Sequence, residues 1–219
     1  MARALGCGHA RGGWQRRRAV TLALVAATGF SQASAQGILQ LDSFDEREDR
    51  GIWSRANQRR LDNLAIMGVV GLSLWEGTET RLGRASWQAL DAGVTTAVTT
   101  EAMKRVFSRP RPSQNPDPGV FFAGSGNRSF PSGEVAMITA FTTPYILAYK
   151  DDYPAVWAMA ALPVYMGRAR MASQAHWLTD VIAGGAVGAG MGYLAAHRET
   201  PLVLGVTGRS VFVGLHYRF

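Results

Sequence analysis

Basic side chains, a glycine-bearing turn and a histidine follow one another in an order that suits phosphate chemistry. The basic residues are Lys104, Arg111 and Arg170; the turn is Pro131, Ser132 and Gly133; the histidine is His176, with Asp180 four residues later. Fixed cations and backbone N–H groups bind phosphate, and an imidazole is a nucleophile for its phosphorus. The pattern therefore predicts phosphoryl transfer.

The turn and the histidine also have local structural interpretations. Ser132 precedes an apolar stretch and is a candidate helix N-cap, with Glu134 in the first turn. A helix N-terminus also binds anions, so capping and phosphate binding are compatible. His176 and Asp180 share one helical face, where the carboxylate can orient the ring. Arg170, six residues before His176, favours the catalytic interpretation.

The basic charge of the chain is concentrated at its start. The formal net charge is +7, but five of the 23 basic residues lie in the first 35 positions, which contain no acidic residue. The rest of the chain carries 18 basic and 16 acidic residues. We therefore expect no nucleic-acid partner, because a general polyanion-binding surface needs a larger excess of positive charge.

The first 35 residues resemble a secretory signal peptide. A basic start is followed by the apolar run Ala19–Phe30 and by Ala33, Ser34 and Ala35, a small-residue pattern that precedes cleavage sites. An uncleaved anchor is the alternative, although about 12 apolar residues are short for a spanning helix. We expect export to the periplasmic side of the envelope. Cys7, the single cysteine, lies in this segment, which excludes disulfides and cysteine-based metal or catalytic sites from the mature chain.

Apolar segments separated by short polar turns predict an all-α fold. A polar segment, 36–60, leads into a helical domain, 61–197, in which we expect a bundle of five main helices. The last helix carries Gly184, Gly188 and Gly192 four residues apart, a stripe that lets helix backbones approach closely. The expected helices cover residues 61–75, 85–106, 135–149, 155–167 and 179–196.

Two parts of the chain do not follow a helical pattern. Residues 108–131 hold most of the prolines and several glycines, which predicts a loop. Arg109 in this loop is either a further phosphate ligand or a solvated side chain. Apolar and polar residues alternate near the C-terminus, which predicts a small β-hairpin-like tail over 198–219.

The lengths of the apolar helices are borderline for a membrane. They run about 13 to 18 residues, or roughly 20 to 27 Å, against a hydrocarbon core of about 30 Å. Helices of alternating direction bring residues 104–134 and 170–176 to one end of the bundle, in a membrane as in a soluble bundle. We expect membrane association.

The motifs together resemble the type 2 phosphatidic acid phosphatase and haloperoxidase superfamily over roughly residues 60–197. The family pattern is Lys, six residues, Arg-Pro; then Pro-Ser-Gly-His; then Ser-Arg, five residues, His, three residues, Asp. The resemblance implies that His176 is the nucleophile forming a phosphohistidine and that Asp180 orients it. It also implies that Lys104, Arg111, Arg170 and the amides around Ser132 and Gly133 hold the phosphate, in a pocket that can accept vanadate as a phosphate mimic.

Two positions depart from the family pattern. Ala169 replaces a serine, which removes one hydrogen bond to the phosphate, and Glu134 replaces the histidine that protonates the leaving oxygen. An ordinary glutamate, with a pKa of about 4.3, is ionised at neutral pH and repels phosphate. Catalysis by Glu134 therefore requires a raised pKa, or a diphosphate substrate whose leaving group needs less help.

Three functional hypotheses follow. The first is a hydrolase of phosphoric monoesters or diphosphates, acting on a lipid phosphate or another envelope phosphoester, with Glu134 as a catalytic acid. The second is a pseudoenzyme that binds lipid phosphate without turnover. The third is a vanadate-dependent haloperoxidase. For the hydrolase we expect no cofactor and no metal.

Overall fold

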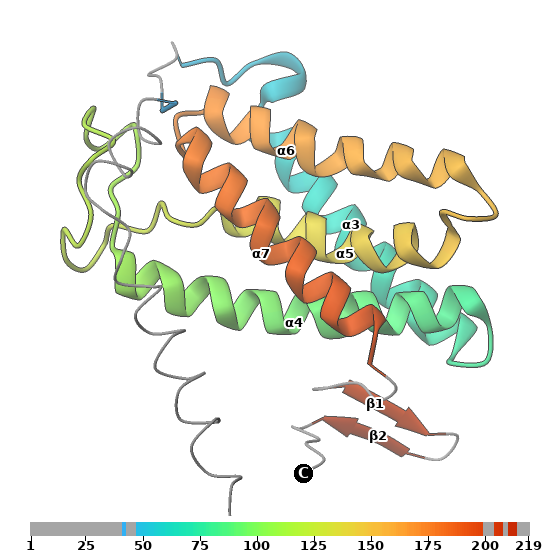
Figure 1. The fold of residues 1–219 in the computed structure, drawn as a ribbon. Coiled ribbons are helices and arrows are strands. Elements are labelled where there is room, and N and C mark those ends of the chain that lie inside the picture. Colours follow the sequence, from blue (N-terminus) through green and yellow to red (C-terminus); the bar gives the residue numbers. More distant parts are fainter. Residues whose placement is uncertain (1–40, 43–46, 199–203, 208–209, 214–219) are drawn as a thin grey trace, which may run out of the picture. The chain divides into compact units, whose positions relative to one another are not determined.

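The computed structural model describes residues 41–42, 47–198, 204–207 and 210–213 (Figure 1). The predicted signal peptide, 1–35, and much of the predicted tail lie outside the described residues. Within them, the polypeptide forms the helical bundle expected from the sequence.

Five α-helices make up the bundle, which confirms the all-α prediction. They are α3 (Arg55–Glu76), α4 (Arg81–Phe107), α5 (Gly133–Tyr149), α6 (Ala161–Ala172) and α7 (Leu178–Ala196), with two short 3₁₀ helices, η1 (Gly51–Trp53) and η2 (Pro154–Ala160). Helix α5 is central and packs against α4, α6 and α7 (Figure 1). The segment between α4 and α5 is a loop, as its prolines and glycines predict.

The glycine stripe of α7 brings two helix N-termini together. A Cβ atom on Gly184 would lie 2.4 Å from the carbonyl oxygen of Ser132, and one on Gly188 would lie 2.1 Å from that of Ala136. Any larger residue would force α7 away from α5. Because the helices touch at backbone level, the start of α5 and the start of α7 lie next to each other at the same end of the bundle.

Helix α3 begins six residues before the expected position. The Ser54 side chain caps it by accepting a hydrogen bond from the backbone N–H of Asn57. The polar residues that follow, from Arg55 to Arg60, were expected to precede the helix but form its first turns. Helix α6 is also displaced from the expected 155–167, because Pro154 starts the 3₁₀ helix η2 and α-helical geometry begins only at Ala161.

Two strands follow the bundle. Strand β1 (Leu204–Thr207) pairs antiparallel with β2 (Ser210–Val213), and Leu204 lies opposite Val213. The expected hairpin-like tail over 198–219 stays a prediction, since residues 199–203, 208–209 and 214–219 lie outside the described part of the chain.

Candidate active site

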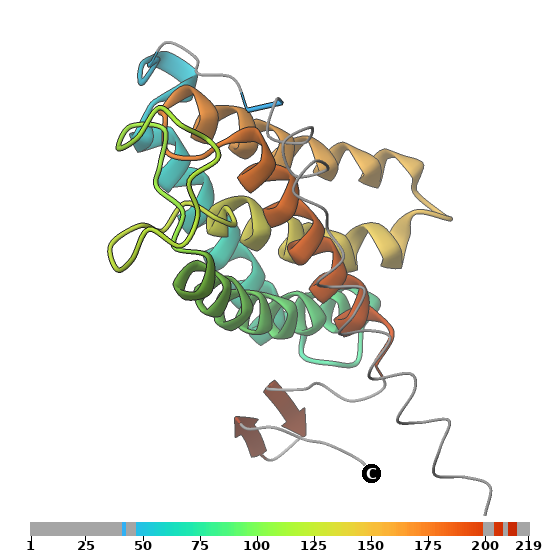
Figure 2. The ribbon, with the colours of Figure 1, turned by 60° about the vertical axis from the view of Figure 1, so that its left-hand side comes forward.

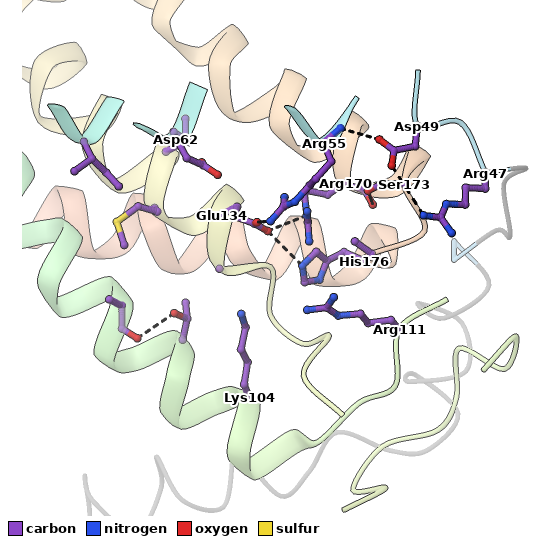
Figure 3. A pocket seen from close by; sticks show the side chains of 17 residues that line it. Arg47, Asp49, Arg55, Asp62, Lys104, Arg111, Glu134, Arg170, Ser173 and His176 are labelled. Atoms are coloured by element: carbon purple, nitrogen blue, oxygen red, sulfur yellow. Dashed lines mark hydrogen bonds and ion pairs between the residues drawn. The ribbon is translucent and has the colours of Figure 1, made fainter. Parts of the chain in front are cut away.

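A pocket of about 550 Å³ opens at the end of the bundle where α4 ends and α5 begins. Figures 1 and 2 show the loop between these helices at this end, next to the start of α7. Six of the predicted site residues line the pocket: Lys104, Arg111, Gly133, Glu134, Arg170 and His176 (Figure 3). The other two, Ser132 and Asp180, are buried beneath it.

Three cations from different segments surround the pocket. Lys104 lies in the last turn of α4, Arg111 in the following loop, and Arg170 in the last turn of α6. The Lys104 ammonium lies over the start of α5, since a Cβ on Gly133 would be 2.9 Å from its Nζ. Burial lowers the pKa of Lys104, and burial lowers the pKa of Arg170 to about 10. Arg170 therefore stays charged at neutral pH.

The imidazole of His176 is buried and held by a backbone carbonyl. Its Nδ1 lies 2.7 Å from the carbonyl oxygen of Ser129. A carbonyl oxygen only accepts hydrogen bonds, so this contact holds a proton on Nδ1, and in the neutral imidazole the lone pair is then on Nε2. Nε2 lies 3.8 Å from a Glu134 carboxylate oxygen inside the pocket. In this tautomer, the nitrogen with the lone pair faces the pocket.

Asp180 lies within ion-pair distance of the imidazole but makes no close hydrogen bond to it, so any orienting effect on the ring is indirect. Its Oδ2 lies 3.8 Å from His176 Nδ1, which is too long for a hydrogen bond. That oxygen instead accepts from the Trp177 backbone N–H at 2.9 Å and from the Ser129 hydroxyl. Ser129 is therefore the residue that orients the ring, and Asp180 acts on it through Ser129 and through its nearby charge.

Arg109 belongs to the structural base of the site and not to its phosphate ligands. Its guanidinium is completely buried and pairs with Asp180 at 2.5 Å and with Asp42 at 2.7 Å. It also donates to the Thr179 hydroxyl at 2.7 Å. The sequence could not show this, because an Arg-Pro repeat in a proline-rich loop usually lies in solvent and Asp42 is 67 residues away.

Ser132 stands at the N-cap position of α5, but its side chain makes no capping hydrogen bond. Its backbone N–H donates to the Asp180 carbonyl oxygen at 2.9 Å, so this amide is not free for phosphate. Its buried hydroxyl has no hydrogen-bond partner among the described residues. The Ser132 amide is therefore engaged in this state, and the expectation that the amides around Ser132 and Gly133 hold the phosphate stays a prediction.

Glu134 is ion-paired, and the ligand-free site lowers its pKa, the opposite of the rise that catalysis by Glu134 as an acid would require. Its carboxylate lies 2.7 Å from an Arg55 nitrogen and 2.8 Å from Arg170 Nε (Figure 3). Burial alone would raise its pKa, but His176, Arg170 and Arg55 outweigh burial and hold the pKa well below its usual range. Glu134 is thus a carboxylate among the cations that were expected to bind phosphate.

Helix α3 contributes site residues that sequence analysis did not identify. Gln58 is fully buried, and its side-chain oxygen accepts from Arg170 at 3.0 Å and from Arg55 at 3.1 Å. Its amide nitrogen donates to the Trp53 and Ala169 carbonyls at 2.8 and 3.2 Å. Gln58 therefore fixes the two guanidiniums that face Glu134.

Asp62, one turn further along α3, is a second carboxyl group of the pocket. Burial, with the negative charge of Glu134, raises its pKa to about 6, although Arg55 and Arg170 oppose the rise. A sequence signal for these residues does exist. Ser54 is a candidate helix cap, and Arg55, Gln58 and Asp62 follow it at intervals of three and then four residues, which places these three side chains on one helix face.

A metal centre was not expected from the sequence. Among the residues that the structure describes, no group of three or more His, Cys, Asp or Glu side chains is arranged to hold a metal ion.

The chain matches the PAP2 superfamily model over residues 86–201, more than half of its length. It therefore belongs to the PAP2 superfamily, the family that the three motifs indicated. It is also 36% identical to a lipid A 1-phosphatase of Rhizobium johnstonii over 99 residues, which cover 43% of this chain and 39% of that protein. A structural comparison matches the crystal structure of Aquifex aeolicus LpxE with a TM-score of 0.45 and 15% identity, over 68% of this chain and 88% of that one.

Proposed function

We propose that this protein hydrolyses the phosphate group of a lipid, through a phosphohistidine intermediate on His176. The observation that carries the proposal is the convergence of Lys104, Arg111 and Arg170 on one pocket that the Nε2 side of His176 also faces. Three cations match the charge of a phosphate and of the phosphoryl group in transfer. A purely structural histidine needs no such surroundings.

In the proposed reaction, the phosphate takes the place that Glu134 occupies among the cations. His176 Nε2 then attacks the phosphorus, and the bond to the leaving oxygen breaks. The attack places positive charge on the imidazole, which the Ser129 carbonyl at Nδ1 and the Asp180 carboxylate 3.8 Å away stabilise. Water then hydrolyses the phosphohistidine and releases inorganic phosphate.

A lipid substrate is favoured by the surface of the bundle and by the relative whose printed name is lipid A 1-phosphatase. Large apolar side chains are exposed on several helices, and Trp75 is 87% exposed. Exposed apolar side chains that gather on one surface are typical of membrane or protein contact sites, and several of these lie on one helix, α3. The most exposed members are Leu64, Met67, Leu74 and Trp75 of α3, Val98 of α4 and Val164 of α6.

Among the described helices, only α7 is long and apolar enough to cross a membrane. About a third of its most apolar window, 33%, is buried inside the bundle. With the exposed apolar side chains and the expected signal peptide, this supports an enzyme associated with the periplasmic side of an envelope membrane.

The pseudoenzyme hypothesis is supported by one specific observation. The Glu134 carboxylate already pairs with Arg170 and Arg55, so the chain supplies its own anion to the site. A substrate phosphate must displace this carboxylate before it can react. If displacement is not followed by phosphoryl transfer to His176, the protein would bind lipid phosphate without hydrolysing it.

Replacing Glu134 by glutamine is expected to strengthen inhibition by vanadate or inorganic phosphate about tenfold or more. The neutral amide no longer competes for Arg170 and Arg55, and a tenfold change corresponds to about 1.4 kcal/mol. Asp151→Asn, which removes the same charge from a surface ion pair with Lys150, should leave inhibition unchanged. Weaker inhibition in Glu134→Gln would mean that Glu134 itself binds the anion, as a protonated acid does.

The direct test of the proposed function is phosphate release by the purified full chain. The substrates are phosphatidic acid and a lipid diphosphate in phosphatidylcholine vesicles, with glycerol phosphate as a soluble comparison. We expect release from the lipid substrates and much slower release from glycerol phosphate. Binding to the lipid phosphates without release of phosphate would establish the pseudoenzyme instead.

A further inference from the structure

The proposed reaction lacks a proton donor. An alkoxide leaving group must be protonated as its bond to phosphorus breaks. Glu134 occupies the position at which the family has a histidine, but it is ionised and ion-paired with Arg170 and Arg55. His176 carries its ring proton on Nδ1, against the Ser129 carbonyl and away from the pocket. Another acid must therefore supply the proton.

Asp62 lies in the right part of the pocket for this role. It lines the same cavity as Arg170 and His176, and Figure 3 shows it on the other side of the Glu134 carboxylate from His176. If phosphate replaces that carboxylate, the oxygen that leaves opposite to the attacking Nε2 points to the side of Asp62. In the described part of the chain, no hydrogen bond or ion pair holds the Asp62 carboxyl group, so it is free to donate.

The surroundings of Asp62 favour its protonated form. The charged groups that face it are Arg55 on its own helix, Glu134 on α5 and Arg170 on α6, with Lys104 of α4 on the opposite side of the pocket. The two arginines are already neutralised in part by Glu134. A bound phosphate would add further negative charge beside Asp62 and favour the protonated carboxyl group still more.

The apolar side chains that line the pocket also indicate that the leaving group lies on the Asp62 side. Ile66, one helical turn after Asp62, lines the cavity together with Ala97, Met137 and Ile138. The apolar part of a lipid alcohol fits against these side chains, which places its oxygen near the carboxyl group of Asp62.

We propose that Asp62 is the catalytic acid that protonates the leaving oxygen, the role that the family pattern assigns to the position of Glu134. This inference rests on the proposed phosphatase function. In the first step, His176 Nε2 forms the bond to phosphorus, the ester P–O bond breaks, and the alkoxide takes the proton of Asp62. In the second step, the Asp62 carboxylate takes a proton from the attacking water, the P–N bond breaks, and inorganic phosphate leaves.

The test compares two substrates that differ in their need for a proton. Dodecyl phosphate has an alkoxide leaving group, whereas 4-nitrophenyl phosphate releases a stabilised phenolate that needs no acid. For Asp62→Asn we expect kcat/KM on dodecyl phosphate, which reports only the steps up to formation of the phosphohistidine, to fall about 100-fold or more, the usual size of general acid catalysis. The value of kcat/KM on 4-nitrophenyl phosphate should change less than about threefold, which also reports that the variant is folded.

The pH profile provides a second readout. In the native enzyme, kcat/KM on dodecyl phosphate should fall about tenfold per pH unit above about pH 6, where Asp62 loses its proton. This limb should be absent from Asp62→Asn and present in Asp151→Asn, the control for the loss of one negative charge at the surface.

The outcomes separate this inference from the proposed function. Equal losses on both substrates, or a loss below about threefold on dodecyl phosphate, would show that Asp62 is not the acid while phosphatase activity stands. If the native protein releases phosphate from neither substrate, the proposed function fails, and the role of Asp62 fails with it.

Discussion

Replacement of His176 by alanine should reduce phosphate release about 10⁴-fold or more, because loss of a nucleophile removes the covalent route entirely. The native enzyme, quenched during turnover of a ³²P-labelled substrate, should carry acid-labile radioactivity, and His176→Ala should carry none. His197→Ala is the matched control, since this exposed histidine also contacts a carbonyl oxygen, that of Tyr193 at 2.9 Å, but lies at the end of α7.

Acid-labile phosphate on His176→Ala, or activity close to native, would mean that the nucleophile is another residue. Thermal unfolding separates catalysis from stability. The ring contributes one hydrogen bond to Ser129, so a modest decrease in stability is expected beside the large loss of activity. A lower stability with activity retained in the folded fraction would support a structural role for His176.

Arg109→Met should destabilise the fold by about 3 to 5 kcal/mol, the usual cost of removing one partner from a buried charge pair. The substitution leaves Asp42 and Asp180 buried without their cation, and it removes the donor to the Thr179 hydroxyl. For a chain of this size, the unfolding midpoint should fall by roughly 10 °C. Thermal and urea unfolding of the purified variants measure both quantities.

Arg105→Met is the control for Arg109→Met, because Arg105 pairs with Glu101 at the surface. Exposed pairs of this type contribute about 0 to 1 kcal/mol, so the control should remain near native stability. A similarly small effect in Arg109→Met would contradict a stabilising role for the buried network of Arg109, Asp42 and Asp180.

The fold and much of the site could be predicted from local information. Apolar periodicity locates the helices, and prolines and glycines locate the loop between α4 and α5. The spacing of Lys104 and Arg111 places both cations at the end of one helix. The glycine stripe predicts a close helix contact, which the 2.1 Å approach of a Cβ on Gly188 to the Ala136 carbonyl confirms. These features depend on residues a few positions apart, which is why the sequence alone determines them.

The protonation and hydrogen bonding of the site were decided only by the tertiary structure. The pKa of Glu134 depends on Arg55, 79 positions away, and on Arg170, 36 positions away. His176 is oriented by the backbone carbonyl of Ser129. Because every residue has a backbone carbonyl, the sequence gives no sign of which one contacts the ring. Arg109 binds two carboxylates from distant segments, and Asp62 enters the pocket because α3 packs beside α4 and α5. Electrostatic energies depend on distance and burial in three dimensions. The sequence could therefore identify the charged groups of this site, but only the tertiary structure could determine which of them hold protons.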